Sequence, residues 1–134
     1  MKVKDWMSKK VVTVEPTTSV KKAYGLMKQN GFHHLPVVKG DRVVGIVTDR
    51  DLRRPDISDI FKEWAELYRL NDDIHVEDVM ATPVVTVTPE TDLLAAASIL
   101  IEKKFNALPV VDGQGRLCGI ITTVDFLKGM IRGR

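Results

Sequence analysis

Two short segments of this chain combine residue types that could hold a phosphate and a ribose. They read Gly45-Ile46-Val47-Thr48-Asp49-Arg50-Asp51 and Gly119-Ile120-Ile121-Thr122-Thr123-Val124-Asp125. In each segment a predicted strand turns into a predicted helix at a threonine, Thr48 or Thr122. The first backbone N–H groups of a helix have no partner within it and the helix dipole favours an anion, so a phosphate could bind there.

A carboxylate follows three residues after each threonine. Asp51 and Asp125 are expected to face the same opening as the threonines, and a carboxylate so placed can accept both hydrogens of a ribose diol. The glycines that open the segments, Gly45 and Gly119, would let a ligand approach the strand backbone. The sequence therefore predicts two sites of the same kind.

The same spacing also fits a helix cap that needs no ligand. Thr-x-x-Asp is close to a capping box, in which the two side chains satisfy the first N–H groups of the helix. Both interpretations stay open, although two copies behind the same Gly-Ile and β run favour ligand binding in at least one. The copies differ chemically, because Arg50 could pair with a phosphate and Val124, its counterpart, could not.

His33 and His34 are further candidates, at positions where the second copy has Asn106 and Ala107. Adjacent strand residues point to opposite faces, so only one of the two histidines can enter a given cleft. That histidine could contact a phosphate or titrate near neutral pH. The alternative is an exposed or hydrogen-bonded strand histidine without a ligand.

No residue pattern indicates catalysis or metal binding. The chain has neither G-x-x-x-x-G-K-[ST] nor G-x-G-x-x-G, and no Ser/His/Asp order stands out. It has three histidines and one cysteine, Cys118, which excludes an internal disulfide and a cysteine-built zinc site. We expect Cys118 to be buried and unreactive. The sequence thus predicts no enzyme, no catalytic residue and no metal ligand.

The candidate segments are positioned by a unit that the chain contains twice. The offset between copies is 73 residues from Met7/Met80 to Pro36/Pro109 and 74 residues from Gly45/Gly119 to Asp51/Asp125. Each copy predicts the order β-α-β-β-α, with strands at 11–14, 34–38 and 43–47, and at 84–87, 107–111 and 117–121. A twofold repeat indicates two units that bury a shared face. We expect an α/β (α+β) fold with pseudo-two-fold repeats packed sheet to sheet, in which residues 1–54 and 78–134 are the repeats.

The ends of the first helix of each repeat can be read from capping signals. Thr18 or Ser19 can cap the first, and Thr91 or Asp92 the second, because the side-chain oxygens of these residue types accept hydrogen bonds from the first N–H groups of a helix. Gly31 suits the position after the first helix. Because Lys104 stands there in the second repeat, we expect that helix to end differently.

Residues 55–77 have no counterpart in the rest of the chain. Their apolar residues recur at helical spacing: Ile57, Ile60, Phe61, Trp64, Leu67 and Tyr68. The stripe is either a helix packed on its own core or a surface for self-association or a partner, since aromatic residues often anchor interfaces.

Composition is that of an ordinary globular protein, with 134 residues, 44% hydrophobic residues and a net charge of +2. Basic residues are scattered, which argues against a nucleic-acid partner. No apolar stretch is long enough for a bilayer and no secretory signal opens the chain, so we expect a cytoplasmic protein without a membrane partner.

The doubled pattern resembles a pair of CBS motifs, the regulatory module named for cystathionine β-synthase. The resemblance rests on the openings Asp5-Trp6-Met7 and Asp78-Val79-Met80, the two Leu-Pro-Val-Val strands and the Gly-Ile-Val-Thr-Asp-Arg-Asp-Leu segment. It covers nearly the whole chain outside residues 55–77. The long aromatic linker also resembles stand-alone CBS-pair proteins of the acetoin-utilisation regulatory type.

The resemblance implies a set of ligand-contacting positions. They are Thr48, Asp51, Thr122 and Asp125 for phosphate and ribose; Gly45, Ile46, Gly119 and Ile120 beside the base; Lys9, Val11, Thr82 and Val84 lining the base pocket; and His33, His34, Asn106 and Ala107, which can reach ribose or phosphate. We add Arg50 to this set because its side chain could pair with a phosphate.

The resemblance also implies a function. We expect a regulatory sensor that requires no cofactor, binds AMP, ADP or ATP (or S-adenosylmethionine or a nicotinamide dinucleotide), forms a homodimer through its helices and signals to a regulated protein. The alternative is a dimerisation scaffold with vestigial clefts.

Overall fold

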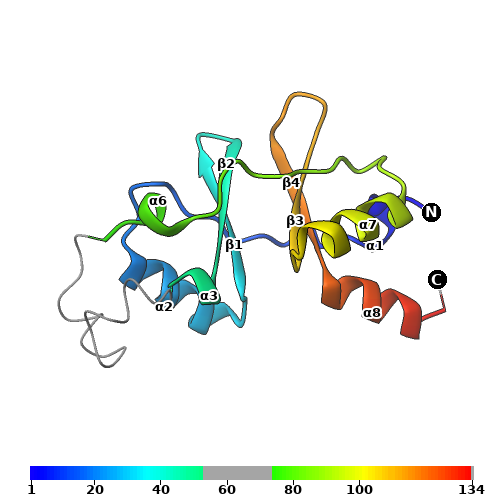
Figure 1. The fold of residues 1–134 in the computed structure, drawn as a ribbon, viewed down its shortest axis with the longest axis horizontal. Helices are drawn as coiled ribbons and strands as arrows, with labels where there is room; N and C mark the ends of the chain where they lie inside the picture. The colour runs from blue at the N-terminus through cyan, green and yellow to red at the C-terminus, as the bar shows by residue number, and fades with distance from the viewer. Residues whose placement is uncertain (53–73, 134) are drawn as a thin grey trace. The chain divides into compact units, whose positions relative to one another are not determined.

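The computed structural model describes residues 1–52 and 74–133, so the whole predicted linker stripe, Ile57 to Tyr68, lies outside the described residues. The helices and strands are shown in Figure 1. In chain order they are α1 (Val3–Trp6), α2 (Val20–Asn30), β1 (His34–Lys39), β2 (Arg42–Thr48), α3 (Asp49–Leu52), α6 (Val76–Val79), α7 (Leu93–Lys103), β3 (Ala107–Val111), β4 (Leu117–Thr122) and α8 (Thr123–Ile131). The predicted α+β fold is confirmed.

The chain divides into two compact units whose segments are interleaved along the sequence. Unit 1 comprises Met1–Val11, Asp41–Val43 and Val85–Arg134, and unit 2 comprises Val12–Gly40 and Val44–Val84. The opening segment of each predicted repeat therefore packs in the unit that holds the helices of the other repeat. The boundaries of the sequence repeats therefore differ from the boundaries of the packed units.

The two predicted hairpins are present as two-stranded sheets, β1–β2 and β3–β4. The β3–β4 sheet lies in unit 1, and β1–β2 lies in unit 2 apart from Arg42 and Val43, which belong to unit 1. In the second hairpin Leu108 lies opposite Ile121. Gly40 (φ 69°) and Gly115 (φ 82°) adopt the left-handed backbone conformation that these turns need.

The strands predicted at 11–14 and 84–87 are each reduced to a single bridging residue. Val14 pairs in parallel with Val37: its N–H donates to the carbonyl of Pro36 (3.1 Å) and its carbonyl accepts from Val38 (2.8 Å). The next pairing step on either side would need an N–H group from Pro36 or from Pro16, and proline has none. Prolines on both sides therefore stop the pairing after one residue.

The second repeat follows the same rule. Val87 pairs in parallel with Val110 through two bonds of 3.1 and 2.8 Å. Extension would require N–H groups at Pro89 and Pro109. The predicted strands were too long in both copies. The prediction rested on the β-branched residues and did not consider which backbone N–H groups are available to extend the pairing.

Helix α2 begins and ends as predicted, and α7 begins after Asp92, one of its two predicted N-caps, but does not end as expected. Ser19 accepts a hydrogen bond from the Lys22 N–H (3.1 Å), and Gly31 ends α2 with φ 70°. Asp92 is the N-cap of α7 but its side chain makes no cap hydrogen bond. Lys104 ends α7 with φ 58°, the conformation that Gly31 adopts, so the expectation of a different ending was wrong.

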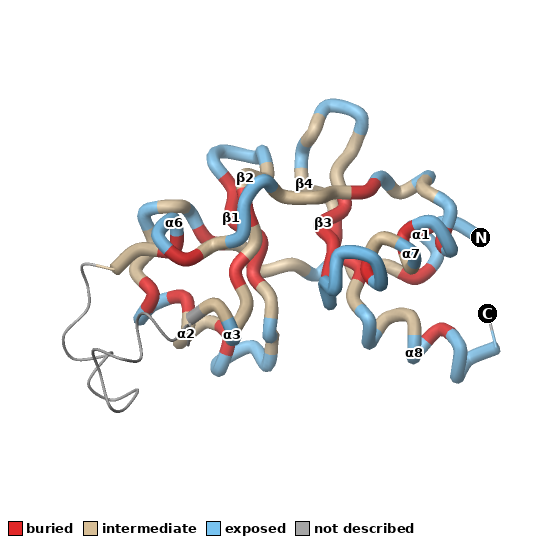
Figure 2. Tube along the Cα trace, in the orientation of Figure 1, coloured by how far each residue is buried: buried red, intermediate tan, exposed pale blue. Residues whose placement is uncertain are grey.

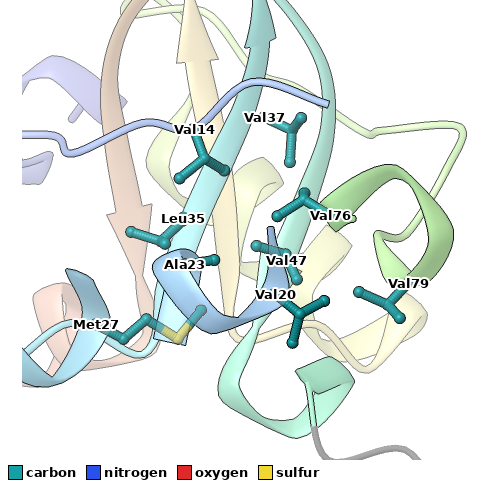
Figure 3. Close-up of a cluster of buried hydrophobic side chains, with 9 residues drawn as sticks. All are labelled: Val14, Val20, Ala23, Met27, Leu35, Val37, Val47, Val76 and Val79. Atoms are coloured by element: carbon teal, nitrogen blue, oxygen red, sulfur yellow. The ribbon is translucent and has the colours of Figure 1, made fainter. Parts of the chain in front are cut away.

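A hydrophobic cluster fills each unit. Figure 3 shows the cluster of unit 2, formed by Val14, Val20, Ala23, Met27, Leu35, Val37, Val47, Val76 and Val79. The cluster of unit 1 consists of Val3, Trp6, Val87, Leu93, Ala96, Leu100, Leu108, Val110 and Ile121. The helical spacing of Val20, Ala23 and Met27 predicted the buried face of α2, which is confirmed. Among the described residues, no helix is both long and apolar enough to cross a membrane.

Candidate ligand-binding site

In the first copy, Thr48 and Asp51 form a capping box where β2 runs into α3 (Figure 1). The Thr48 N–H donates to Oδ2 of Asp51, and the Asp51 N–H donates to Oγ1 of Thr48, both at 3.0 Å. Both residues are half-buried. Their side chains are thus held rigidly at the end of the strand.

Thr122 and Asp125 form the same box at the start of α8. The Thr122 N–H donates to Oδ2 of Asp125 at 2.9 Å, and the Asp125 N–H donates to Oγ1 of Thr122 at 3.1 Å. In both copies these bonds to the carboxylate use Oδ2. Because a carboxylate offers about four lone-pair sites on its two oxygens, capping occupies only part of its acceptor capacity. Capping and ribose binding are compatible uses of the same residue.

At each glycine of the two segments, the backbone of another segment lies close to the strand. A Cβ on Gly119 would lie 2.8 Å from the carbonyl oxygen of Ser8, and one on Gly45 would lie 3.2 Å from that of Ala81 and 2.6 Å from Sδ of Met80. The close approach that these glycines permit in the structure is therefore made by the protein chain itself.

Backbone bridges hold these approaching segments in place. Ser8 and Ile120 exchange two hydrogen bonds, of 2.8 and 2.9 Å, and Ala81 pairs with Ile46. Ser8 and Ala81 were not singled out from the sequence. The repeated openings Asp-Trp-Met and Asp-Val-Met were the available signal, but sequence spacing does not reveal which hairpin a segment joins.

Each candidate site consequently draws on both sequence repeats. Unit 1 holds Lys9 and Val11 together with the second-copy residues Gly119, Ile120, Asn106, Ala107, Thr122 and Asp125. Unit 2 holds Thr82 and Val84 together with the first-copy residues Gly45, Ile46, His33, His34, Thr48, Arg50 and Asp51. The structure groups every predicted site residue into one of these two sets.

The residue before each hairpin is tied to the first residue of the helix that follows it. The Asp49 N–H donates to the His33 carbonyl at 3.2 Å, and the Thr123 N–H donates to the Asn106 carbonyl at 2.9 Å. The side chains also meet, with Nδ1 of His33 lying 3.3 Å from Oδ2 of Asp49. Oγ1 of Thr123 lies 3.4 Å from Oδ1 of Asn106. The first site thus carries an ionisable pair where the second carries a neutral one.

His33 and His34 differ in exposure, but not by the predicted strand alternation, because only His34 belongs to β1 and His33 precedes it. The His33 side chain is 74% exposed, whereas His34 is half-buried. Burial lowers the pKa of His34 below its ordinary 6.5, with a smaller opposing effect from Asp49. Since burial disfavours the charged form, His34 is neutral at neutral pH.

Cys118 is half-buried, and its thiol donates to the Val110 carbonyl at 3.4 Å. Burial and the nearby carboxylate of Asp112 raise the pKa of this thiol. The thiolate, which is the reactive form, is therefore disfavoured. Within residues 1–52 and 74–133 there is no cluster of His, Cys, Asp and Glu that could hold a metal ion.

The model of the CBS domain family matches residues 3–56 and 76–132 of this chain. The two matches together cover more than half of the chain and contain both candidate segments. The chain therefore belongs to the CBS-domain family and carries two CBS motifs.

Relatives match along almost the whole chain. A Methanocaldococcus jannaschii protein is 32% identical over 133 residues, which are 98% of this chain and 44% of that protein. A CBS domain-containing protein of Dictyostelium discoideum is 33% identical over 135 residues, 97% of this chain and 91% of the relative. The chain thus spans less than half of the first of these proteins and nearly all of the second.

Solved structures share the fold over the same extent. CBSX2, which is from Arabidopsis thaliana, in complex with AMP superimposes with a TM-score of 0.80 and 33% identity, covering 98% of this chain and 96% of CBSX2. A Vibrio cholerae protein named for acetoin utilisation (AcuB) gives a TM-score of 0.79 and 30% identity, covering 98% and 91%. The predicted resemblance to stand-alone CBS pairs, including the acetoin-utilisation type, is confirmed.

Proposed function

We propose that this chain is a regulatory, non-enzymatic module that binds an adenosine ligand of the AMP, ADP or ATP type. The observation that carries the proposal is the complex of CBSX2 with AMP, because that protein shares the fold along nearly the whole chain at 33% identity. The repeated Thr-x-x-Asp geometry supports it, since each copy holds a hydroxyl and a carboxylate in a fixed arrangement. We expect this chain to act in the cytoplasm.

The roles of the site residues follow from their chemistry. Asp51 and Asp125 accept hydrogen bonds from the ribose hydroxyls, and Thr48 and Thr122 face the phosphate. Arg50 adds a cation in the first site, where its counterpart Val124 offers none. The base lies beside the middle of β2 and β4 and the segments that approach them: Gly45, Ile46, Thr82 and Val84 in unit 2, and Gly119, Ile120, Lys9 and Val11 in unit 1.

Regulation requires that the ligand binds one arrangement of the module better than another. Ligand binding would then change the arrangement that a regulated protein recognises. We also expect two copies of the chain to associate through their helices. S-adenosylmethionine and nicotinamide dinucleotides contain the same adenosine and belong among the ligands to be tested.

A second candidate function is a scaffold whose ligand sites are vestigial. The observation that favours it is that both capping boxes are complete without a ligand. Capping alone would then account for the threonines and the aspartates.

A thermal-shift panel distinguishes the two candidates. Protein freed of co-purified nucleotide would be heated with AMP, ADP, ATP, S-adenosylmethionine or NAD, each at a hundredfold excess over an assumed micromolar dissociation constant. A ligand at a hundred times its dissociation constant stabilises the folded state by about 2.7 kcal/mol. A clear shift with an adenosine ligand, absent with a guanosine or cytidine nucleotide, supports the sensor. No shift with any ligand supports the scaffold.

A further inference from the structure

Met7 and Met80 stand at matching positions of the two repeats, and neither is among the residues assigned to ligand binding. Met7 directly follows α1, and Met80 directly follows α6. Both residues are half-buried, at the point where the chain passes from the buried residues of the helix to an exposed segment; Figure 2 shows this change after α6. Small solutes in the solvent can therefore reach both thioethers.

The sulfur atoms lie against the glycines of the two proposed ligand sites. Sδ of Met80 is 2.6 Å from the point where a Cβ on Gly45 would stand, and Sδ of Met7 is 3.2 Å from the corresponding point at Gly119. Each sulfur thus occupies the space that a side chain on the strand would fill. Because Gly45 and Gly119 are assigned to the base side of the sites, the thioethers are immediate neighbours of the proposed ligand.

A hydrogen-bond acceptor added to either sulfur would find no donor in the adjacent backbone bridge. The carbonyl oxygens of Ala81 and Ser8 lie 3.2 and 2.8 Å from the same two points. The N–H groups of both bridges are already engaged, since Ala81 and Ile46 bond to each other, as do Ser8 and Ile120. An oxygen on the sulfur would therefore lie close to a carbonyl oxygen and lack a partner, which is unfavourable.

Apolar side chains lie on the other side of each methionine. Met80 packs against the hydrophobic cluster of unit 2, and Met7 packs against that of unit 1. Because oxidation makes the thioether polar, the modified side chain fits neither the cluster nor the face of the glycine unless its segment moves. The same two segments continue into residues assigned to the base, which are Lys9, Val11, Thr82 and Val84. Movement of either segment would thus change the base side of a site.

We propose that Met7 and Met80 are oxidation sites, and that hydrogen peroxide weakens ligand binding by converting them to methionine sulfoxide. A lone pair of the thioether sulfur attacks one peroxide oxygen, a sulfur–oxygen bond forms, and the O–O bond breaks. The departing hydroxide takes up the proton of the transferred hydroxyl and leaves as water. Sulfur is oxidised by two electrons, and the peroxide is reduced by two. Methionine sulfoxide reductases reverse the modification, which makes it suitable for regulation.

The other three methionines provide internal comparisons. Met27 is 3% exposed and belongs to the cluster of unit 2, so it should be oxidised last. Met1 and Met130 are 57% and 68% exposed and should be oxidised readily. Neither is among the side chains that lie closest to the site glycines, so their oxidation should leave both sites unchanged.

Peptide mass spectrometry and hydrogen exchange test the modification without a ligand. In a Cys118→Ser background, so that no thiol reacts with the oxidant, nucleotide-free protein would be treated with increasing concentrations of hydrogen peroxide. We expect sulfoxide at Met7 and Met80 at peroxide concentrations that leave Met27 intact. Exchange of the N–H groups in the two backbone bridges should then become at least about tenfold faster.

Calorimetric titration of AMP tests the consequence for binding, with each protein compared with its own untreated sample. Peroxide should lower the affinity of the Cys118→Ser protein at least about tenfold, and the two classes of methionine sulfoxide reductase should together restore it. The added variant Met7→Leu, Met80→Leu keeps the volume of the side chains but cannot form a sulfoxide, so peroxide should leave its affinity unchanged. The matched control Met130→Leu retains both site methionines and should lose affinity like the parent protein.

Four results would each overturn the proposal. They are oxidation of Met27 before Met7 and Met80, unchanged exchange in the two bridges, unchanged AMP affinity in the treated parent protein, and an equal loss of affinity in the Met7→Leu, Met80→Leu variant. The effect on binding rests on the proposed function, whereas the exchange measurement does not. If the untreated chain binds no AMP, the proposed function fails, and the exchange measurement alone decides whether the bridges respond to oxidation.

Discussion

Nδ1 of His33 lies 3.3 Å from Oδ2 of Asp49, and the backbone N–H of Asp49 donates to the carbonyl of His33. The second copy repeats the backbone bond between Thr123 and Asn106 but has neutral side chains there. The fold thus fixes the place of this pair through the backbone, while the side chains are free to differ. We infer that the two candidate sites differ in charge and in ligand preference.

Exchanging the first pair for the second should leave the fold intact. The double variant His33→Asn, Asp49→Thr copies residues that occupy the matching positions of the second copy. Because the His33 side chain is largely exposed, we expect the free energy of unfolding to change by at most about 1 kcal/mol. Urea denaturation measures this value, and a loss of several kcal/mol would show that the pair is a structural requirement.

Lys104→Gly should stabilise the protein by about 1 kcal/mol. Lys104 has φ 58°, a conformation that costs a residue with a Cβ about 1–2 kcal/mol and glycine almost nothing. Part of the gain is offset by the larger entropy of glycine in the unfolded chain. Lys103→Gly is the matched control, since Lys103 is the last residue of α7 and glycine lowers helix stability by up to about 1 kcal/mol. Equal effects of the two substitutions on the urea midpoint would contradict this account.

Two glycine-to-alanine substitutions in helices should have opposite signs. A Cβ on Gly25 meets no atom within 4 Å, so Gly25→Ala should stabilise α2 by about 1 kcal/mol. A Cβ on Gly129 would overlap the ring of Trp6, which is buried and packs edge-on against Phe126. Gly129→Ala should therefore destabilise the protein by about 1–3 kcal/mol despite the better helix propensity of alanine. Thermal unfolding of both variants checks the signs, and a stabilising Gly129→Ala would mean that Trp6 moves freely.

His34 should make the free energy of unfolding depend on pH. Its folded pKa lies below the ordinary value of 6.5, so the unfolded chain binds the proton more readily. Its contribution to stability is complete above pH 6.5 and is lost as the pH falls from there through the folded pKa. We expect the wild type to lose more stability than His34→Gln between pH 7.5 and pH 5. Parallel pH profiles for the two proteins would show that His34 is not the cause.

Local features of this fold were predictable from sequence, and features set by pairing partners were not. The hairpins and the caps at Ser19 and Gly31 depend on neighbouring residues, so their residue types predicted them. The length of the bridge at Val14 depends on whether Pro36 can donate, which requires the strand register. That Lys104 adopts the conformation of Gly31 shows that tertiary packing can outweigh the preference of a residue.

Prediction of the candidate sites was limited in the same way, because contacts between distant segments could not be read from the sequence. The sequence predicted the pairing of threonine and aspartate in each copy, because a capping box spans only four residues. It could not predict that Lys9 and Val11 belong with the second-copy residues. Ser8 reaches Ile120 across more than a hundred residues of chain, and only the folded structure shows that contact.

The carboxylates of this chain provide matched controls for ligand binding. Asp5 and Asp78 cap α1 and α6 as Asp51 and Asp125 cap their helices: Oδ2 accepts from the N–H three residues earlier, at 2.8 and 2.9 Å. Removing any of the four carboxylates removes a helix cap, at a cost of about 1 kcal/mol. Only Asp51 and Asp125 lie in the proposed ligand sites.

Calorimetric titration of AMP into nucleotide-free protein therefore tests the central claim most directly. The wild type would be compared with the double variants Asp51→Ala, Asp125→Ala and Asp5→Ala, Asp78→Ala, all at a temperature where each is folded. We predict that AMP binds the wild type and the Asp5, Asp78 variant alike, and that the Asp51, Asp125 variant loses at least about tenfold in affinity, since a charged hydrogen-bond partner contributes about 1.5–3 kcal/mol. Equal affinity in all three proteins, or no AMP binding by the wild type, would contradict the account.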